Sequence, residues 1–240
     1  MAELRILVTG SEGLIGRALR RLLSEQGIAT GGLDPRSERD EERGDVCSKD
    51  DVTRALRGVA GIVHLGAVSR VIDAERDPHL CRRVNEEGTR TVLAAALAAA
   101  PRPWIIYGSS REVYGQQDRM PVREDAPLRP KNVYARGKVA AEGLVIQARE
   151  AGLATAILRF SNVYGDVHDH ADRVIPAFAR TAAIGGVLRV DGAACTFDFT
   201  HVADVADGIQ RVVQRLMAGE RALPPIHLAS GRETSLGALA

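Results

Sequence analysis

The sequence predicts an α/β fold in which a doubly wound parallel sheet is followed by a small C-terminal region. Two observations support this. Short apolar runs alternate with amphipathic stretches as far as Tyr164, and the first run ends in a glycine-rich turn that opens a helical pattern. With 240 residues, the chain is long enough for one large domain with an appendage. We expect residues 1–165 to form the sheet domain and 166–240 to form mainly a second region, interleaved with the last strands and helices of the sheet.

The apolar runs predict strands at 4–8, 28–33, 61–65, 104–108 and 154–160. The stretches between them carry apolar residues at helical spacing and predict helices at 14–26, 48–57, 77–100 and 133–151. Such alternation favours parallel strands joined by right-handed helical crossovers. Further along, we expect helices at 174–184 and 202–217 and short strands at 187–190 and 226–229.

The last residues, 235–240, have the pattern of the first turns of a helix that is then cut off. We therefore expect the sequence to be a truncated form of a longer protein.

The composition excludes several classes of partner. A formal net charge of +1 and an aromatic content of 4% do not favour binding to nucleic acid or to an anionic membrane. The longest apolar run, 92–100, is too short to span a bilayer. Three widely spaced cysteines predict no disulfide framework, and Glu3 and Arg5 interrupt any signal-peptide pattern. We expect a soluble cytoplasmic protein.

The glycine-rich turn predicts a dinucleotide site. Gly10, Gly13 and Gly16 follow a strand and open a helix, with Leu14 and Ile15 among them. Glycines let the backbone approach a pyrophosphate, and the helix N-terminus offers it unpaired N–H groups. The spacing is G-x-x-G-x-x-G rather than G-x-G-x-x-G, so position along the chain carries the argument for a Rossmann-type sheet.

Asp34 follows the second predicted strand, where a carboxylate can bind the adenosine ribose hydroxyls and repel a 2′-phosphate. This favours NAD over NADP, but Arg36 is close enough in sequence to pair with such a phosphate, so NADP is not excluded. Asp45, with Val46, is a candidate for contact with the adenine amino group, or for a cap of the helix that follows.

Tyr134 and Lys138 lie one helical turn apart on the same face of a predicted helix. A neighbouring ammonium favours the phenolate, so Tyr134 is a candidate general base. Ser110, which follows the fourth predicted strand, is positioned to hydrogen-bond a substrate hydroxyl, and Glu112 is a candidate second acid or base.

The ordered set of motifs resembles the extended short-chain dehydrogenase/reductase superfamily, in its NAD-dependent nucleotide-sugar epimerase/dehydratase branch. The segments that carry the resemblance, in chain order, are residues 9–16, Asp34, Asp45-Val46, 64–67, Asn85, 109–115, Tyr134 with Lys138, 159–165 and 198–206.

The resemblance implies NAD as cofactor and a role for each matching residue. The cofactor would be bound by Gly10, Gly13, Leu14, Ile15, Gly16, Asp34, Arg36, Asp45, Val46, Leu65, Gly66, Ala67, Asn85, Tyr134, Lys138 and Phe160. The catalytic residues would be Ser110, Tyr134, Lys138 and Glu112. The substrate would be contacted by Ser69, Ser110, Arg111, Asn162, Val174 and Arg189. Residues 77–100 and 133–151 would form a homodimer interface.

Two departures from the family pattern bear on the substrate. Phe197 stands where similar proteins carry an arginine that binds the diphosphate, and Arg189 or Arg180 is a candidate to replace it. Arg111 stands where 4,6-dehydratases have aspartate. A third feature, the group His168, Asp169, His170 and Asp172, resembles metal ligands by type, but we interpret it as a solvated loop and expect no metal.

These features predict an NAD-dependent epimerase that acts on a nucleotide-activated sugar through a transient 4-keto intermediate, with Tyr134 as base. The alternatives are a 4,6-dehydratase or uronate decarboxylase that uses Glu112, a simple NAD(P)-dependent sugar dehydrogenase or reductase, and a non-catalytic NAD-binding regulator.

Overall fold

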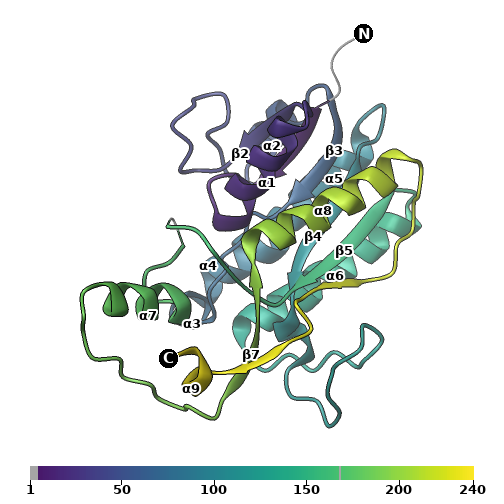
Figure 1. Ribbon diagram of the computed structural model, residues 1–240. Coiled ribbons are helices and arrows are strands. Elements are labelled where there is room, and N and C mark those ends of the chain that lie inside the picture. Colours follow the sequence, from purple (N-terminus) through teal and green to yellow (C-terminus); the bar gives the residue numbers. More distant parts are fainter. Residues whose placement is uncertain (1–4, 168) are drawn as a thin grey trace.

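A six-stranded parallel sheet, with strand order β2-β1-β3-β4-β5-β8, forms the centre of the computed structural model, which describes residues 5–167 and 169–240 (Figure 1). Its strands are β1 (Arg5–Thr9), β2 (Thr30–Leu33), β3 (Val59–His64), β4 (Trp104–Ser110), β5 (Thr155–Phe160) and β8 (Ile226–Leu228). The five strands predicted for this sheet are confirmed, although Leu4 lies outside the described residues, and the short strand predicted at 226–229 joins the same sheet as β8. The order reverses at β1, which has β2 on one side and β3 on the other, and ligands bind at such a switch point in open parallel sheets.

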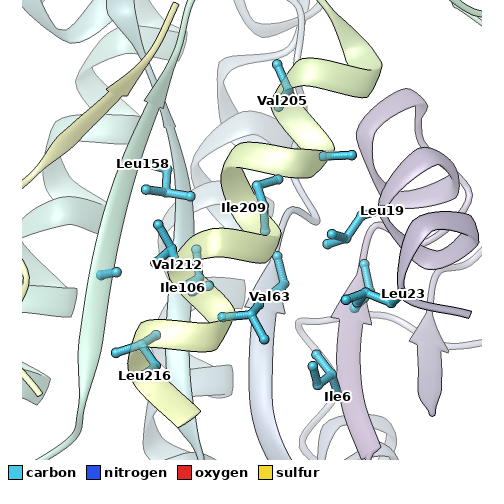
Figure 2. Packing of buried hydrophobic residues seen from close by; sticks show 14 of the residues in the cluster. Ile6, Leu19, Leu23, Val63, Ile106, Leu158, Val205, Ile209, Val212 and Leu216 are labelled. Atoms are coloured by element: carbon cyan, nitrogen blue, oxygen red, sulfur yellow. The ribbon is translucent and has the colours of Figure 1, made fainter. Parts of the chain in front are cut away.

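Two helices cover one face of this sheet: α1 (Leu14–Glu25) and α8 (Val202–Met217). Because side chains alternate along a strand, Ile6 and Val8 face these helices while Leu7 faces the opposite side. Figure 2 shows Ile209 of α8 beside Leu19 of α1 and above the sheet residues of this cluster. The chain beyond residue 165 thus contributes a helix and a strand to the sheet domain.

The other face packs against α2 (Lys49–Ala55), α5 (Thr89–Ala98) and α6 (Val133–Glu150), through residues such as Leu7, Ile62, Val92 and Val145. The helix predicted at 77–100 is interrupted. It consists of α4 (Pro78–Arg82), a π-helical turn (Arg83–Gly88) and α5. A Cβ at Gly88 would lie 2.7 Å from Cγ2 of Val46, so this segment packs closely against the loop before α2.

The C-terminal region contains a second, three-stranded sheet made of β6 (Asn162–Tyr164), β7 (Thr196–His201) and β9 (Glu233–Ser235). Two of the helices predicted there are present, as α7 (Val174–Ala183) and α8, and α9 (Leu236–Leu239) ends the chain. The strand predicted at 187–190 is wrong: these residues form neither helix nor strand, and Val187 is 94% exposed. The sequence also gave no signal for α3 (Val71–Arg76).

No helix among the described residues is long and apolar enough to cross a membrane.

Candidate functional site

A pocket of about 910 Å³ opens where β1, β3, β4 and β5 end, and it continues toward α7. Most of the predicted site residues line it: Gly10, Gly13, Leu14, Ile15, Gly16, Asp34, Arg36, Asp45, Val46, Leu65, Gly66, Ala67, Ser69, Ser110, Arg111, Glu112, Tyr134, Lys138, Phe160, Asn162 and Val174. Residues scattered along the chain therefore meet in one cavity because parallel strands share a carboxyl edge.

The glycine turn has the geometry that a pyrophosphate requires. Gly10 has φ +68°, a conformation that side chains disfavour, and a Cβ at Gly16 would lie 2.3 Å from the carbonyl oxygen of Gly10. Gly13 is the N-cap of α1 and makes no side-chain cap, and the first turn of α1 carries no acidic residue. The first N–H groups of the helix remain available to an anion.

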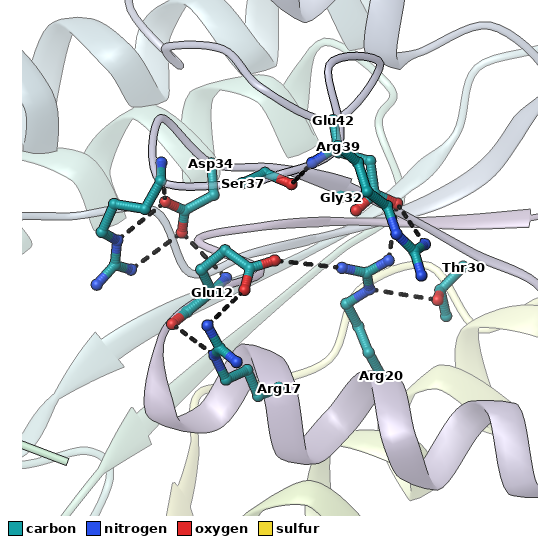
Figure 3. Close-up of polar contacts among 10 residues, drawn as sticks. Glu12, Arg17, Arg20, Thr30, Gly32, Asp34, Ser37, Arg39 and Glu42 are labelled. Atoms are coloured by element: carbon teal, nitrogen blue, oxygen red, sulfur yellow. Dashed lines mark hydrogen bonds and ion pairs between the residues drawn. The ribbon is translucent and has the colours of Figure 1, made fainter. Parts of the chain in front are cut away.

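Another part of the pocket is organised around Asp34, which lies beside Glu12 (Figure 3). The side chain of Asp34 is 2% exposed. Its Oδ2 accepts the backbone N–H of Glu12 at 3.1 Å, and both carboxylate oxygens accept bonds from the Arg36 guanidinium at 3.0 Å. Burial alone would raise the pKa of Asp34, but the bonds from Arg36 and Glu12 outweigh it and lower the pKa. The carboxylate is therefore ionised and already neutralised by Arg36.

The loop after β3 is tied to β1 and to the π-helical turn. Oγ1 of Thr9 accepts the N–H of Gly66 at 3.0 Å and contacts Nδ1 of His64 at 2.6 Å. Asn85 does not line the pocket. Its buried amide instead bonds both backbone groups of Val68, at 2.8 and 3.0 Å. In the structure Asn85 therefore holds this loop, and its contact with the cofactor stays a prediction.

Tyr134, Lys138 and Ser110 come together in the middle of the pocket. The side-chain oxygen of Asn132 caps α6 by accepting the N–H of Ala135 at 2.7 Å, which fixes the first turn that carries Tyr134. Lys138 is 3% exposed, and its Nζ donates to the carbonyl oxygen of Gly108 at 2.7 Å and lies 5.8 Å from the centre of the Tyr134 ring. The predicted arrangement of a phenol, an ammonium and a hydroxyl is present in the structure.

Burial dominates the electrostatics of this trio. It raises the pKa of Tyr134 to about 12, although a hydrogen bond with Ser110 acts in the opposite direction. Burial also lowers the pKa of Lys138 to about 8, against the opposing influence of Cys81 and Glu142. The ammonium is thus mostly charged at neutral pH, whereas Tyr134 needs further positive charge nearby before it can serve as a base.

A buried ion pair supports the strands beneath the trio. Glu142 of α6 and Arg159 of β5 are 2% and 5% exposed, and their Oε2 and Nη2 atoms lie 2.7 Å apart. The hydroxyl of Ser109 donates to Oε1 of Glu142 at 2.5 Å. The strand that presents Ser110 is therefore fixed to the helix that presents Tyr134. Spacing rules gave no signal for this pair, because its members are distant in sequence.

Glu112 is held at the rim of the trio. Its Oε1 pairs with Nη2 of Arg111 at 3.0 Å, and its Oε2 accepts the amide of Asn132 at 3.1 Å. Both carboxylate oxygens already have partners, which opposes a role as a free proton donor.

Arg189 does not reach the pocket. Its side chain is 87% exposed and pairs with Asp191 at 3.3 Å, and Arg180 is also exposed and absent from the lining. Because neither side chain lines the pocket, the structure gives no support to either as a replacement for the cation expected at position 197. The side chain that approaches Phe197 is instead Arg111, whose Cζ lies 5.5 Å from the ring centre.

The composition of the loop before α7 suggested that it is solvated, but part of this loop is buried in the structure. Asp169 lines the pocket with its side chain 1% exposed, and it pairs with Arg173 at 3.2 Å, whereas Asp172 is 61% exposed and pairs with Arg70. No group of three or more possible ligands for a metal occurs among the described residues, which do not include His168. Arg70 and Glu12 also line the pocket but were not among the predicted site residues, because their positions depend on contacts between distant segments.

Comparisons with known proteins agree with this architecture. Residues 6–223 match the model of the NAD dependent epimerase/dehydratase family. The chain is 28% identical to a UDP-glucose 4-epimerase of Streptomyces lividans, over 90% of this chain and 73% of that protein. It is 30% identical to a UDP-glucose 4-epimerase of Mycolicibacterium smegmatis, over 97% and 79%.

Solved structures give the same result. The UDP-glucose 4-epimerase from Brucella ovis in complex with NAD superimposes with a TM-score of 0.88 at 26% identity, covering 98% of this chain and 80% of that one. The dTDP-glucose 4,6-dehydratase DesIV from Streptomyces venezuelae, with NAD bound, gives 0.84 at 30% identity, covering 97% and 78%. The resemblance seen in the sequence is confirmed: this chain belongs to the NAD dependent epimerase/dehydratase family, within the extended short-chain dehydrogenase/reductase superfamily.

Proposed function

We propose that this protein is an NAD-dependent epimerase that inverts the 4-position of a nucleotide-linked sugar. The observation that carries the proposal is the buried trio of Ser110, Tyr134 and Lys138 beside the glycine turn of one continuous pocket. Similarity to UDP-glucose 4-epimerases supports the substrate class.

The residues present fit NAD. Gly10 and Gly16 leave no room for side chains where the pyrophosphate would approach, the uncapped start of α1 faces that place, and the ionised Asp34 suits ribose hydroxyls. When bound, the nicotinamide supplies a site that accepts a hydride and returns it. Tyr134 would remove the proton from the 4-hydroxyl, Ser110 would orient that hydroxyl, and the Lys138 ammonium would stabilise the phenolate.

A 4-keto sugar results from this step. Rotation of this keto sugar within the pocket, return of the hydride to the opposite face of C4, and return of the proton from the Tyr134 hydroxyl to the 4-oxygen would give the epimer without net consumption of cofactor. A dehydratase or decarboxylase needs an additional group that acts on the neighbouring carbon. The two bonds that occupy the carboxylate of Glu112 argue against this alternative, although a dTDP-glucose 4,6-dehydratase of Streptomyces griseus is 30% identical.

The test is incubation with NAD and UDP-glucose, UDP-glucuronate or dTDP-glucose, followed by mass spectrometry and chromatography of the sugars. An epimer of unchanged mass supports the proposal, whereas loss of water or carbon dioxide would move the function to a dehydratase or decarboxylase. Reduced cofactor that accumulates would indicate a dehydrogenase.

Tyr134→Phe should lower kcat by about 10²–10⁴-fold, because it removes the proton-transfer group, and should leave NAD binding within about twofold. Tyr107→Phe is the matched control, since the Tyr107 hydroxyl is buried without a hydrogen-bond partner among the described residues and does not line the pocket. Equal turnover by Tyr134→Phe and the parent protein would show that Tyr134 is not the base, and NAD binding without turnover in either protein would indicate a binding role without catalysis.

The homodimer through residues 77–100 and 133–151 also remains a proposal. It is supported by the outward position of Ile146 on α6, whose side chain is 44% exposed.

A further inference from the structure

Arg111 is a half-exposed cation at the reacting end of the pocket. It directly follows Ser110 and begins the 3₁₀ turn Arg111–Tyr114, and its side chain is 42% exposed. Its Nη2 contacts Oε1 of Glu112 at 3.0 Å and Oδ1 of Asn162 at 3.4 Å. Its Nε and Nη1 make no hydrogen bond or ion pair with any residue in the described part of the chain. Most of its donors are therefore open.

The guanidinium is held in a defined orientation. The ring of Phe197 lies under Cζ at 5.5 Å, and the rings of Phe197 and Phe199 are 5.9 Å apart, so the support is a pair of aromatic side chains on β7. Contact with an aromatic face and an anchoring bond to Asn162 reduce the side-chain entropy that a flexible arginine loses on binding a ligand.

Three other arginines of the pocket are already engaged. Arg173 pairs with the buried Asp169, Arg70 pairs with Asp172, and Arg36 is bound by Asp34. Arg111 also has an acidic partner, but Glu112 is shared with Asn132 and occupies only one nitrogen of the guanidinium. A planar, always charged group with open donors suits a pair of oxyanion atoms.

We infer that Arg111, stacked on Phe197, binds an oxyanion of the substrate through its open donors; this rests on the proposed nucleotide-sugar function. Two groups of such a substrate have the required chemistry, namely a carboxylate on the sugar and the diphosphate. Arg111 directly follows Ser110, and Ser110 bonds Tyr134, so Arg111 would lie beside the reacting carbon. This position favours the carboxylate of a nucleotide-linked uronate.

The experiment measures dissociation constants by calorimetry for UDP, UDP-glucose and UDP-glucuronate, in the NAD-loaded Tyr134→Phe protein so that no turnover occurs. Arg111→Met removes the charge and keeps the length of the side chain. Arg211→Met is the matched control, because Arg211 is an exposed arginine paired with Asp207 on α8, outside the pocket. Thermal melting of each variant checks that it is folded.

We expect Arg111→Met to weaken the binding of UDP-glucuronate by about tenfold or more, which is the scale of one charge-assisted hydrogen bond. The binding of UDP and UDP-glucose should change little. Arg111→Lys should restore part of the affinity because it keeps the charge but not the plane. Phe197→Leu should give a smaller loss for the same ligand, since it removes only the supporting ring.

An equal loss for all three ligands would assign the oxyanion to the diphosphate and still support the inference. If Arg111→Met bound every ligand as tightly as Arg211→Met does, the inference would be overturned, even in a protein that epimerises a nucleotide sugar. A protein that binds none of the three ligands contradicts both this inference and the proposed function.

Discussion

At the scale of single residues, sequence spacing predicts the candidate catalytic side chains but not the groups that they contact. The one-turn separation of Tyr134 and Lys138 predicts a shared helix face, and both side chains do line the pocket. The bond from Lys138 to the carbonyl of Gly108 was not predictable, because it joins α6 to a strand that is 30 positions away. The pKa of Tyr134 shows the same limit: the sequence predicts the neighbouring cation, but not that burial raises the pKa to about 12.

Arg36 illustrates how a local contact changes a functional prediction. The sequence left NADP open because Arg36 is close to Asp34, and in the structure the guanidinium of Arg36 neutralises that carboxylate. Arg36→Met should therefore weaken NADPH binding by about tenfold, because an uncompensated carboxylate would face the 2′-phosphate, and should change NADH binding by less than about threefold.

Fluorescence titration with NADH and NADPH measures both constants. Arg39→Met is the control, since Arg39 lies in the same loop and pairs with Glu42 instead, at 3.8 Å. If NADPH bound Arg36→Met as well as it binds the parent protein, Arg36 would have no part in the choice of cofactor.

At the scale of elements, periodicity predicts what local sequence stabilises and misses what tertiary pairing stabilises. The amphipathic pattern of α8 predicts its bounds at 202–217, because an apolar stripe must face the sheet. The strand β7 has no such local signal: its ladder is formed with β6 and β9, which lie more than 30 positions away on either side. The strand predicted at 187–190 failed for the complementary reason, since no neighbouring strand pairs with it.

The junction of the glycine turn and α1 gives a prediction at this scale. A Cβ at Gly16 would lie 2.3 Å from the carbonyl oxygen of Gly10 and 2.9 Å from Cα of Ser11, which is backbone that cannot rotate away. Gly16→Ala should therefore move the helix from the turn, weaken NAD binding by more than about tenfold and lower stability by about 1–3 kcal/mol.

Gly143→Ala is the matched control, because Gly143 lies within α6 and a Cβ there meets nothing within 4 Å. It should raise stability by roughly 0.5–1 kcal/mol through helix propensity and leave NAD binding unchanged. Calorimetric titration and urea unfolding of both variants measure these effects, and similar behaviour of the two would show that the turn tolerates a side chain.

At the scale of the whole molecule, the fold class was predictable because alternation along the chain and the position of the glycine turn both indicate one topology. The sequence predicts α8 as a helix and β8 as a strand. That α8 packs on α1 and that β8 pairs with β5 is seen only in the three-dimensional structure. On the opposite face of the sheet, His64 connects β1, β3 and α5 through Oγ1 of Thr9 at 2.6 Å and Oγ1 of Thr89 at 3.0 Å. Its ring is 1% exposed.

This buried histidine should make the whole fold sensitive to acid. Burial, with a smaller contribution from the charge of Lys138, lowers the pKa of His64 from 6.5 to about 3. Below pH 6.5 the unfolded chain binds a proton that the native protein excludes, so stability is fully present above pH 6.5 and falls by about 1.4 kcal/mol for each pH unit as the pH drops toward 3. Urea unfolding between pH 7 and pH 4.5 measures this slope.

His64→Gln should have lower stability at pH 7, because it disturbs the two threonine contacts, but a shallower fall below pH 6. His79→Gln, which changes an exposed histidine of α4, should keep the slope of the parent protein. Carboxylates with lowered pKa values, such as Asp34 and Asp198, contribute a fall of the same sign in all three proteins and cancel in the comparison. Parallel curves for His64→Gln and the parent protein would contradict the assignment and would place the acid sensitivity in those carboxylates instead.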